Sequence, residues 1–396
     1  MKIAVIGGGA SGITAAIFAK RENSSFKDTD FEKSDRILKK ILATGNGRCN
    51  LSNKNIDSAF YYSSNTDVLN NILSQIPFSE IKQFFESIGI IFCEENYRLY
   101  PYSKRAGAVC DALRFEAERL GIEISCNTPI EKIIPNNNGF FINGNFFDAV
   151  IISAGGAAAP MFGTDGNAFK LLKSLGHTVS SPKPALVPVK VSDNTKSLKG
   201  IRAQCSVTLK INGDEIKKEY GELQFTDFGL SGIVVMQLSR MCEKGSLLSV
   251  DFMPDYKEED LYTYLQSRKK LFYKRRCDEF LIGILHKPLT IFLLEKCGLK
   301  ASAEVSSMSD ASLRKLAHFL KNTEFSVIST MGWNNAQTTS GGALLTEFWP
   351  SSLESKIQKN LYCTGEALDS VGDCGGYNLH WAWITGMLAG KAAAKK

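Results

Sequence analysis

Three glycines near the start of the chain have the type and spacing that suit phosphate binding. Gly7, Gly9 and Gly12 form G-x-G-x-x-G between a short apolar run and a segment whose apolar residues recur at helical spacing. Such glycines allow a tight turn, a close approach of pyrophosphate and packing of a helix on a strand. Glu32 follows at the end of a second expected strand, 29–32, where a carboxylate would bind ribose hydroxyls. The combination predicts a dinucleotide site, whereas the glycines alone would be a weak signal.

A second glycine-rich stretch, ILATGNGRCNLSN at 41–53, has neither helical nor strand periodicity, and we expect a loop. The planar fork of Arg48 suits a phosphate or a carboxylate, with a structural ion pair as the alternative. Cys49 has the chemistry of a redox thiol. No second cysteine lies near it in sequence, however, so we favour a small buried residue over a catalytic one.

Glycines recur near the C-terminus in LYCTGEALDSVGDCGGYNLHWAW, residues 361–383. A glycine turn that enters a helix offers backbone N–H donors to the polar edge of a flavin ring, which favours FAD over a nicotinamide in the dinucleotide site. The alternative is a glycine turn without a ligand. Tyr377 and His380 could form a polar wall or donate a proton, and we assign catalysis to neither. Trp381 and Trp383 are expected in the core.

Length and composition limit the remaining classes. A chain of 396 residues predicts two or three domains, and no apolar run approaches the roughly 18 residues of a membrane span. The start of the chain lacks the features of a signal peptide, so we expect a cytoplasmic protein without membrane contact. Ten cysteines without C-x-x-C and four histidines predict reduced thiols and no metal site. The net charge of +6 permits an anionic ligand without indicating nucleic acid.

The order of expected elements indicates an α/β fold that is interrupted by an insertion. A helix is expected from an N-cap at Ser103 to Gly121, followed by a hairpin at GFFINGN and a buried strand at DAVIISAGG. Prolines and alternating patterns begin at Ser181 and predict a β-rich part. Residues 256–322 read as helices, and the chain ends in another helix.

These motifs together resemble a known family, the BaiN/RdsA-type NAD(P)/FAD-dependent oxidoreductases, which are flavoproteins. The resemblance covers nearly the whole chain. It rests on IGGGASG, KKILATGNGRCNLSN, RLYPYSKRAGAV, GELQFTDFGLSG, TTSGGALLTEF and LYCTGEALDSVGDCGGYNLHWAWITGMLAG, of which the second and the last are highly specific.

The resemblance implies an α/β architecture with a Rossmann-like FAD-binding domain, an inserted β-rich domain and a small helical domain. The FAD-binding domain would comprise 1–182 and 346–396, the β-rich domain 183–255 and 323–345, and the helical domain 256–322. It also implies a set of FAD contacts. These are Gly7, Gly9, Ala10, Ser11, Gly12, Glu32, Lys33, Lys40, Thr44, Asn46, Gly47, Arg48, Cys49, Asn50, Ile130, Ala154, Gly155, Gly156, Gly365, Glu366, Asp369, Gly375, Gly376, Tyr377, Asn378 and Leu379.

This chain departs from the family pattern at three positions. Ala159 stands where a tyrosine is common, Asp227 replaces a histidine, and Ile233 replaces a proline. If the tyrosine or the histidine donates a proton in relatives, that role is missing here. The catalytic residues therefore stay unassigned, and we expect Asp227 to be a turn residue rather than an acid.

The leading hypothesis is an FAD-dependent oxidoreductase that reduces an activated C=C bond of a small molecule, with hydride passing through flavin N5. NAD(P)H would serve as a transient donor through the open cleft between the FAD and β domains, because no second G-x-G-x-x-G is present. An oxidase half-reaction with oxygen also stays open. One alternative is a reductase that forms dihydrouridine in ribosomal RNA, and another is a protein whose FAD is structural. The basic run SRKKLFYKRRCDEF, 267–280, could face RNA, although a solvated helix face is favoured.

Overall fold

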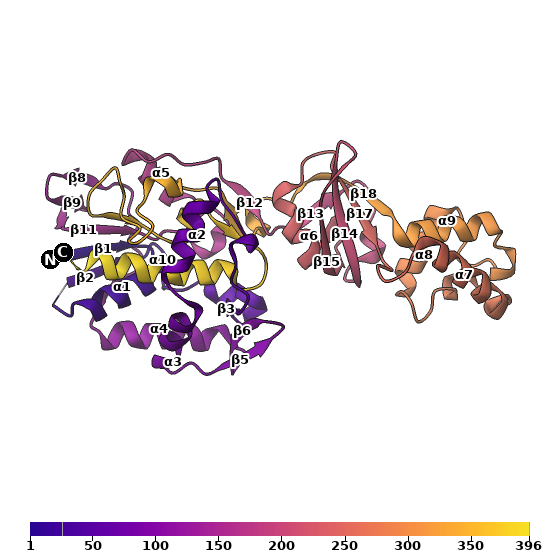
Figure 1. Ribbon diagram of the computed structural model, residues 1–396, viewed down its shortest axis with the longest axis horizontal. Coiled ribbons are helices and arrows are strands. Elements are labelled where there is room, and N and C mark those ends of the chain that lie inside the picture. Colours follow the sequence, from indigo (N-terminus) through magenta and orange to yellow (C-terminus); the bar gives the residue numbers. More distant parts are fainter. Residues whose placement is uncertain (26, 396) are drawn as a thin grey trace. The chain divides into compact units, whose positions relative to one another are not determined.

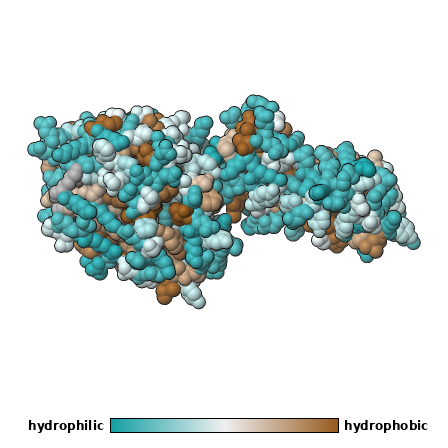
Figure 2. Space-filling view, viewed as in Figure 1, coloured by the Kyte–Doolittle hydropathy of each residue, from teal (hydrophilic) through white to brown (hydrophobic). Residues whose placement is uncertain are grey.

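The structure, a computed structural model, describes residues 1–25 and 27–395. It divides into two compact units, Met1–Ala185 with Trp333–Lys396, and Leu186–Gly332. The first unit is therefore built from segments near both ends of the chain (Figure 1). On the face drawn in Figure 2, most residues are hydrophilic and the hydrophobic ones form small scattered groups. Among the described residues, no helix has the length and apolar character needed to cross a bilayer.

A five-stranded parallel sheet forms the centre of the first unit, in the order β20-β11-β1-β2-β7. The middle strand β1 pairs with β11 on one side and β2 on the other, so that Val5 lies opposite both Ile151 and Asp30. Every residue of β11 is buried, as expected for a parallel sheet covered on both faces. The strands are β1 (Lys2–Ile6), β2 (Lys27–Phe31), β7 (Glu123–Ser125), β11 (Ala149–Ile152) and β20 (Leu361–Cys363). Strand β2 thus ends one residue before the expected end at Glu32.

Helices from the two chain ends pack directly on one another in this unit. Helix α1 (Ala10–Glu22) lies beside α10 (Tyr377–Ala393), as Figure 1 shows. A methyl group on Gly386 would lie 2.5 Å from the carbonyl oxygen of Ser11, and one on Gly390 would lie 2.2 Å from that of Ala15. Only glycine at these two positions permits the observed distance between the helices.

The predicted N-cap at Ser103 is wrong, because helix α4 (Ala106–Arg119) has its N-cap at Arg105. Lys104 donates its backbone N–H to the carbonyl of Pro101 at 2.7 Å and has φ of +51°, so a turn separates Ser103 from the helix. The expected hairpin at 139–145 is confirmed by antiparallel pairing of β9 with β10. The other helices of this unit are α2 (Thr66–Gln75), α3 (Phe78–Ser87) and α5 (Asn167–Ser174). Its small sheets contain β3 (Ser52–Asn53), β4 (Tyr61–Tyr62), β5 (Phe92–Glu95), β6 (Arg98–Pro101), β8 (Ile134–Asn136), β9 (Gly139–Ile142), β10 (Asn145–Phe147), β12 (Lys183–Ala185), β19 (Thr338–Ser340) and β21 (Val371–Gly372).

The second unit combines a closed antiparallel barrel with helices. The barrel runs β13-β16-β15-β14-β17-β18. Its side chains and those of the helices share one hydrophobic core, in which Phe325 of the barrel stacks on Phe292 of α8 at 5.9 Å between ring centroids. The strands are β13 (Val189–Val191), β14 (Arg202–Ile211), β15 (Asp214–Phe225), β16 (Gly229–Ser231), β17 (Leu247–Asp251) and β18 (Thr323–Thr330). The helices are α6 (Ile233–Leu238), α7 (Glu258–Phe272), α8 (Lys287–Cys297) and α9 (Asp310–Lys321). The division into three domains stays a prediction.

Candidate functional site

The N-terminal glycine turn lies between β1 and α1, at the carboxyl end of the central strand. Gly7 has φ of +107°, and a methyl group on it would lie 2.6 Å from the carbonyl oxygen of Ser153 in the neighbouring segment. A methyl group on Gly12 would lie 1.9 Å from the carbonyl oxygen of Gly7. Gly9, in contrast, has no described atom within 4 Å of its methyl position. The outer two glycines therefore serve packing, while Gly9 leaves open space above the turn.

Helix α1 begins with its N-terminal N–H groups uncapped by any described side chain, with Gly9 as the N-cap residue. Such N–H groups, which include those of Ala10 and Ser11, attract an anion. Glu32 stands beside them. Its Oε2 accepts a hydrogen bond from the N–H of Gly8 at 3.0 Å, and its Oε1 accepts one from the N–H of Ser34 at 2.7 Å. The glycine turn thus offers donors and open space with a fixed carboxylate at its rim.

A second cluster of predicted residues lies near Glu32. Lys33 forms an ion pair with Asp165 at 2.7 Å. Asp165 in turn lies two residues before Asn167 in the sequence. Asn167 donates its side-chain N–H to the carbonyl oxygen of Ile130 at 2.8 Å. That carbonyl is therefore already bonded, and an adenine contact would rely on another group of Ile130.

The second glycine loop contains a short 3-10 helix, Ile41–Gly47, with an irregular end where an open loop was expected. Thr44 is extended, and both Asn46 and Gly47 have positive φ. The Cys49 side chain is fully buried, and its burial raises the pKa of the thiol to about 12. The thiol is therefore protonated at neutral pH and is a poor nucleophile.

Arg48 has protein partners in the structure. Its Nη1 lies 3.1 Å from Oε2 of Glu95, and its guanidinium stacks on the ring of Tyr100, 4.6 Å from the centroid. Glu95 also pairs with Lys104. The Arg48 side chain is still 42% exposed, so a ligand contact beside the ion pair stays a prediction.

The second loop meets the C-terminal glycine turn directly. Asn53 donates its side-chain N–H to the carbonyl of Gly375 at 2.9 Å. A methyl group on Gly376 would lie 2.8 Å from Oδ1 of Asn50. That oxygen is buried and has no hydrogen-bond partner among the described residues. An unpaired buried acceptor of this kind fits a donor group on a ligand.

The side chains that open α10 have fixed positions beside this turn. Asn378 both donates to the carbonyl and accepts from the N–H of Gly372, each at 2.8 Å. Burial raises the pKa of Tyr377 to about 12. Burial also lowers the pKa of His380 to about 3, while its Nδ1 shares a hydrogen bond of 2.7 Å with Oγ of Ser52. Both Tyr377 and His380 are therefore neutral at physiological pH. Leu379, between them, packs against the main core.

A third cluster joins four segments of the chain. Lys40 pairs with Glu366 at 2.8 Å, and the other oxygen of Glu366 accepts the N–H of Thr339 at 2.8 Å. The hydroxyl of Thr339 in turn accepts the N–H of Ala157 at 2.9 Å. A methyl group on Gly156 would lie 2.3 Å from that hydroxyl oxygen. Thr339 was missed as a site residue, although the TTSGG motif marked its position.

The remaining predicted residues tie the C-terminal segment to the glycine turn and the loops. A methyl group on Gly365 would lie 2.6 Å from Oγ of Ser11. The indole N–H of Trp381 donates to the carbonyl of Gly365 at 3.0 Å, which agrees with a core position for this tryptophan. Asp369 accepts the N–H of Ser64 at 3.0 Å. Ala154 and Gly155 follow the buried end of β11, with Ser153 between them and the strand.

Asp227 lies in the second unit, in the turn between β15 and β16. It pairs with Lys199 at 3.0 Å, and hydrogen bonding to that lysine lowers the pKa of the carboxyl. A carboxylate held ionised in this way is unsuited to donate a proton. The cysteines other than Cys374 are free thiols. Residues 1–25 and 27–395 contain no cluster of three or more histidine, cysteine or acidic side chains that could hold a metal ion.

The parallel sheet with its glycine turn defines a Rossmann-type α/β protein. The model of the family "HI0933-like protein Rossmann domain" matches residues 1–392, and the chain belongs to this family. It is 37% identical to the 3-dehydro-bile acid delta(4,6)-reductase of Clostridium scindens, over 100% of this chain and 99% of the relative. It is 26% identical, over 96% of this chain and 95% of the relative, to a ribosomal RNA dihydrouridine synthase of Haemophilus influenzae.

Solved structures share the fold at low sequence identity. The 3-ketosteroid delta1-dehydrogenase of Sterolibacterium denitrificans matches with a TM-score of 0.53 and 12% identity, covering 100% of this chain and 99% of that one. The FrdA chain of E. coli quinol fumarate reductase matches with a TM-score of 0.52 and 14% identity, covering 100% of this chain and 70% of that one. At this identity the likeness concerns the fold alone.

Proposed function

We propose that the protein is an FAD-dependent oxidoreductase that reduces an activated C=C bond of a small molecule. The observation that carries the proposal is the open face of Gly9 above the uncapped start of α1, with the carboxylate of Glu32 at its rim. The relative named as a 3-dehydro-bile acid delta(4,6)-reductase, at 37% identity over the whole chain, supports the reaction class.

The residues present fit FAD at two ends. The N-terminal turn would hold the pyrophosphate on the N–H groups of Ala10 and Ser11, with Glu32 binding ribose. The C-terminal turn at Gly375 and Gly376 would bind the polar edge of the ring, and the unpaired Oδ1 of Asn50 offers that edge an acceptor. Bound FAD would supply hydride transfer at its N5 atom.

The neighbouring side chains would position the cofactor rather than react with it. The Lys40–Glu366 pair and the hydroxyl of Thr339 fix the segment that contains Gly156 against the C-terminal segment. His380 is neutral and bonded to Ser52, so it would not carry a charge toward the ring. We propose NAD(P)H as the electron donor and the cytoplasm as the location.

A second candidate function is reduction of uridine in ribosomal RNA. It is favoured by the names of two relatives, at 26% and 24% identity, both called ribosomal RNA dihydrouridine synthase. Anaerobic mixing distinguishes the candidates. Flavin reduced by NADH or NADPH should be reoxidised by an enone under the first function and by RNA under the second. Flavin that no donor bleaches would instead indicate a structural cofactor.

The cofactor assignment is tested by Gly9→Ala. Because no described atom lies within 4 Å of the added methyl group, the variant should fold normally and lose FAD, since the methyl occupies the space proposed for pyrophosphate. Gly107→Ala in α4 is the matched control, because its methyl position is equally open. The readouts are the flavin absorbance of the purified proteins and FAD affinity by fluorescence titration. Equal FAD affinity in both variants would contradict the assignment of the turn.

A further inference from the structure

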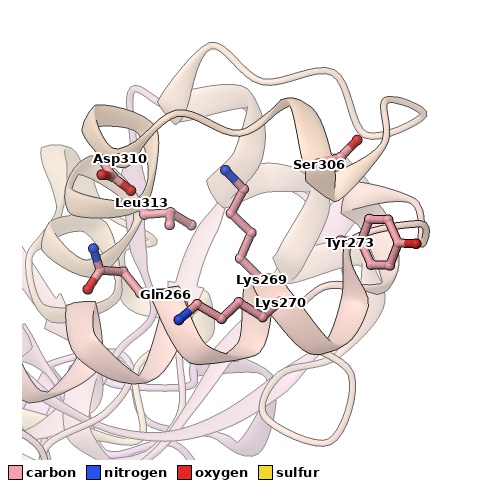
Figure 3. A pocket seen from close by; sticks show the side chains of 7 residues that line it. All are labelled: Gln266, Lys269, Lys270, Tyr273, Ser306, Asp310 and Leu313. Carbon is pink, nitrogen blue, oxygen red and sulfur yellow. The ribbon is translucent and has the colours of Figure 1, made fainter.

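A pocket of about 490 Å³ lies in the second unit, between the end of α7 and the start of α9. This volume falls within the range of small-ligand sites, about 300–1,000 Å³. In Figure 3, two lysines extend from α7 in different directions between the other side chains. The lining residues are Gln266, Lys269, Lys270, Tyr273, Ser306, Asp310 and Leu313.

In the part of the chain that the structure describes, the two lysines that line the pocket form no ion pair, although Asp310 also lines it. Six basic residues lie between 268 and 276. Two of the three arginines pair with carboxylates, and Arg268 is held by backbone carbonyls. Arg268 donates to the carbonyl of Ile282 at 2.6 Å, Arg275 lies 3.6 Å from Glu279, and Arg276 lies 2.8 Å from Asp278.

The three lysines differ from Arg275 and Arg276, which pair with carboxylates. Within the described ranges, Lys269, Lys270 and Lys274 form no ion pair. Lys269 donates to the carbonyl of Met308 at 2.5 Å, which fixes its ammonium group at the pocket wall without cancelling its charge. Two of these lysines, Lys269 and Lys270, line the pocket and bring positive charge to it.

An aromatic ring stands beside these charges. Tyr273 is 50% exposed, and the ammonium of Lys274 lies 5.5 Å from its ring centroid. A half-exposed ring next to lysines offers a base a stacking surface and a phosphate its counter-charge. Asp310 also lines the pocket and would repel an anion. In Figure 3 the two lysine ammonium groups lie between Asp310 and the ring of Tyr273.

We propose that this pocket binds a nucleotide, with its phosphate on Lys269 and Lys270 and its base on Tyr273. The nucleotide is either free or part of a single strand, since both present the same chemistry. The pocket contains none of the candidate cofactor residues, so this inference does not rest on the proposed function.

The test measures binding of fluorescently labelled decauridylate to the purified, full-length protein by anisotropy, with AMP and inorganic phosphate as competitors. Tyr273→Ala should weaken binding roughly 5- to 150-fold, the range of base stacking on an aromatic side chain. Lys270→Gln should weaken binding and lower the slope of log affinity against log salt by about 0.7. Asp310→Asn should have the opposite effect and tighten binding about twofold, because it removes a negative charge that repels the phosphate.

Lys300→Gln is the matched control, since it removes the same charge from an exposed position outside the pocket. If AMP displaces the labelled strand, the ligand is a free nucleotide. If unlabelled decauridylate displaces it and AMP does not, the ligand is a single strand. Phosphate competing as well as AMP would overturn the role of Tyr273. Equal affinities for Lys270→Gln and Lys300→Gln, or no binding of any probe, would overturn the proposal. Flavin content, read from absorbance, should be the same in all variants whatever the outcome.

Discussion

Asp30 is the most unusual buried group near the candidate cofactor site. It lies on β2, two residues before Glu32, and its side chain is fully buried. Neither carboxylate oxygen has a hydrogen-bond partner among the described residues. Burial, and to a smaller extent the negative charge of Glu32, raises the pKa of Asp30 well above its ordinary value. At a pH between the pKa of the unfolded chain and the raised pKa of the folded state, Asp30 therefore keeps its proton in the folded protein and releases it on unfolding.

This difference predicts how stability changes with pH. Below the pKa of Asp30 in the unfolded chain, about 3.9, the carboxyl is protonated in both states and does not lower the free energy of unfolding. Above that pH the free energy of unfolding falls by about 1.4 kcal/mol per pH unit, until the pH passes the raised pKa of the folded state. Asp30→Asn keeps the shape of the side chain and removes the ionisation. The free energy of unfolding of the variant, relative to that of the wild type, should therefore rise by about 1.4 kcal/mol with each pH unit between the two pKa values.

Urea unfolding followed by tryptophan fluorescence at pH 4, 5, 6 and 7 measures this gain. All four tryptophans, 333, 349, 381 and 383, lie in the unit that contains Asp30, so the signal reports the relevant transition. Asp67→Asn, which alters an exposed carboxylate of the same unit, should change stability by less than about 0.5 kcal/mol. A stability difference between Asp30→Asn and wild type that is the same at every pH would refute the reasoning.

Two further substitutions test the second loop and the helix contact. Cys49→Ala should retain FAD and its reduction by the donor. In the native wild type, Cys49 should react with a thiol reagent far more slowly than the partly exposed Cys93, because Cys49 is buried and its pKa is raised to about 12. Loss of flavin reduction in a well-folded Cys49→Ala would support a redox thiol instead. Gly390→Ala places a methyl group 2.2 Å from the carbonyl oxygen of Ala15 and should lower the free energy of unfolding by about 1–3 kcal/mol in urea titrations, whereas an unchanged midpoint would show that the two helices can separate at no cost.

The sequence predicted those features that depend on local spacing. The G-x-G-x-x-G turn, the buried strands and the hairpin follow from patterns within a few residues of each other, and the structure has them. The start of α4 was missed because Lys104 adopts a positive φ, which its residue type does not indicate. Burial of Asp30 was also hidden, since the run DTDFE reads as polar and only the position of β2 between β1 and β7 encloses it.

Contacts between distant segments lay beyond sequence reasoning for a different reason. Lys40 and Glu366 are 326 residues apart, and Ser52 and His380 are 328 apart. Each of these residues had a local explanation as a loop or helix residue, and nothing in its neighbours names the partner. Family resemblance assigned Lys40 and Glu366 to the same ligand, but their ion pair with each other emerges only from the packed structure.

The close packing of α1 on α10 links these observations, because it brings the C-terminal segment at Gly365 next to the start of α1. Gly386 and Gly390 set the distance between the helices, and that distance places Gly365 against Ser11. A ligand that bridges both glycine turns would bind the folded unit and not the unfolded chain, so it would stabilise the unit by an amount that grows with its concentration. Cofactor affinity and the stability of the helix pair should therefore change together, although neither glycine of α10 needs to touch the cofactor.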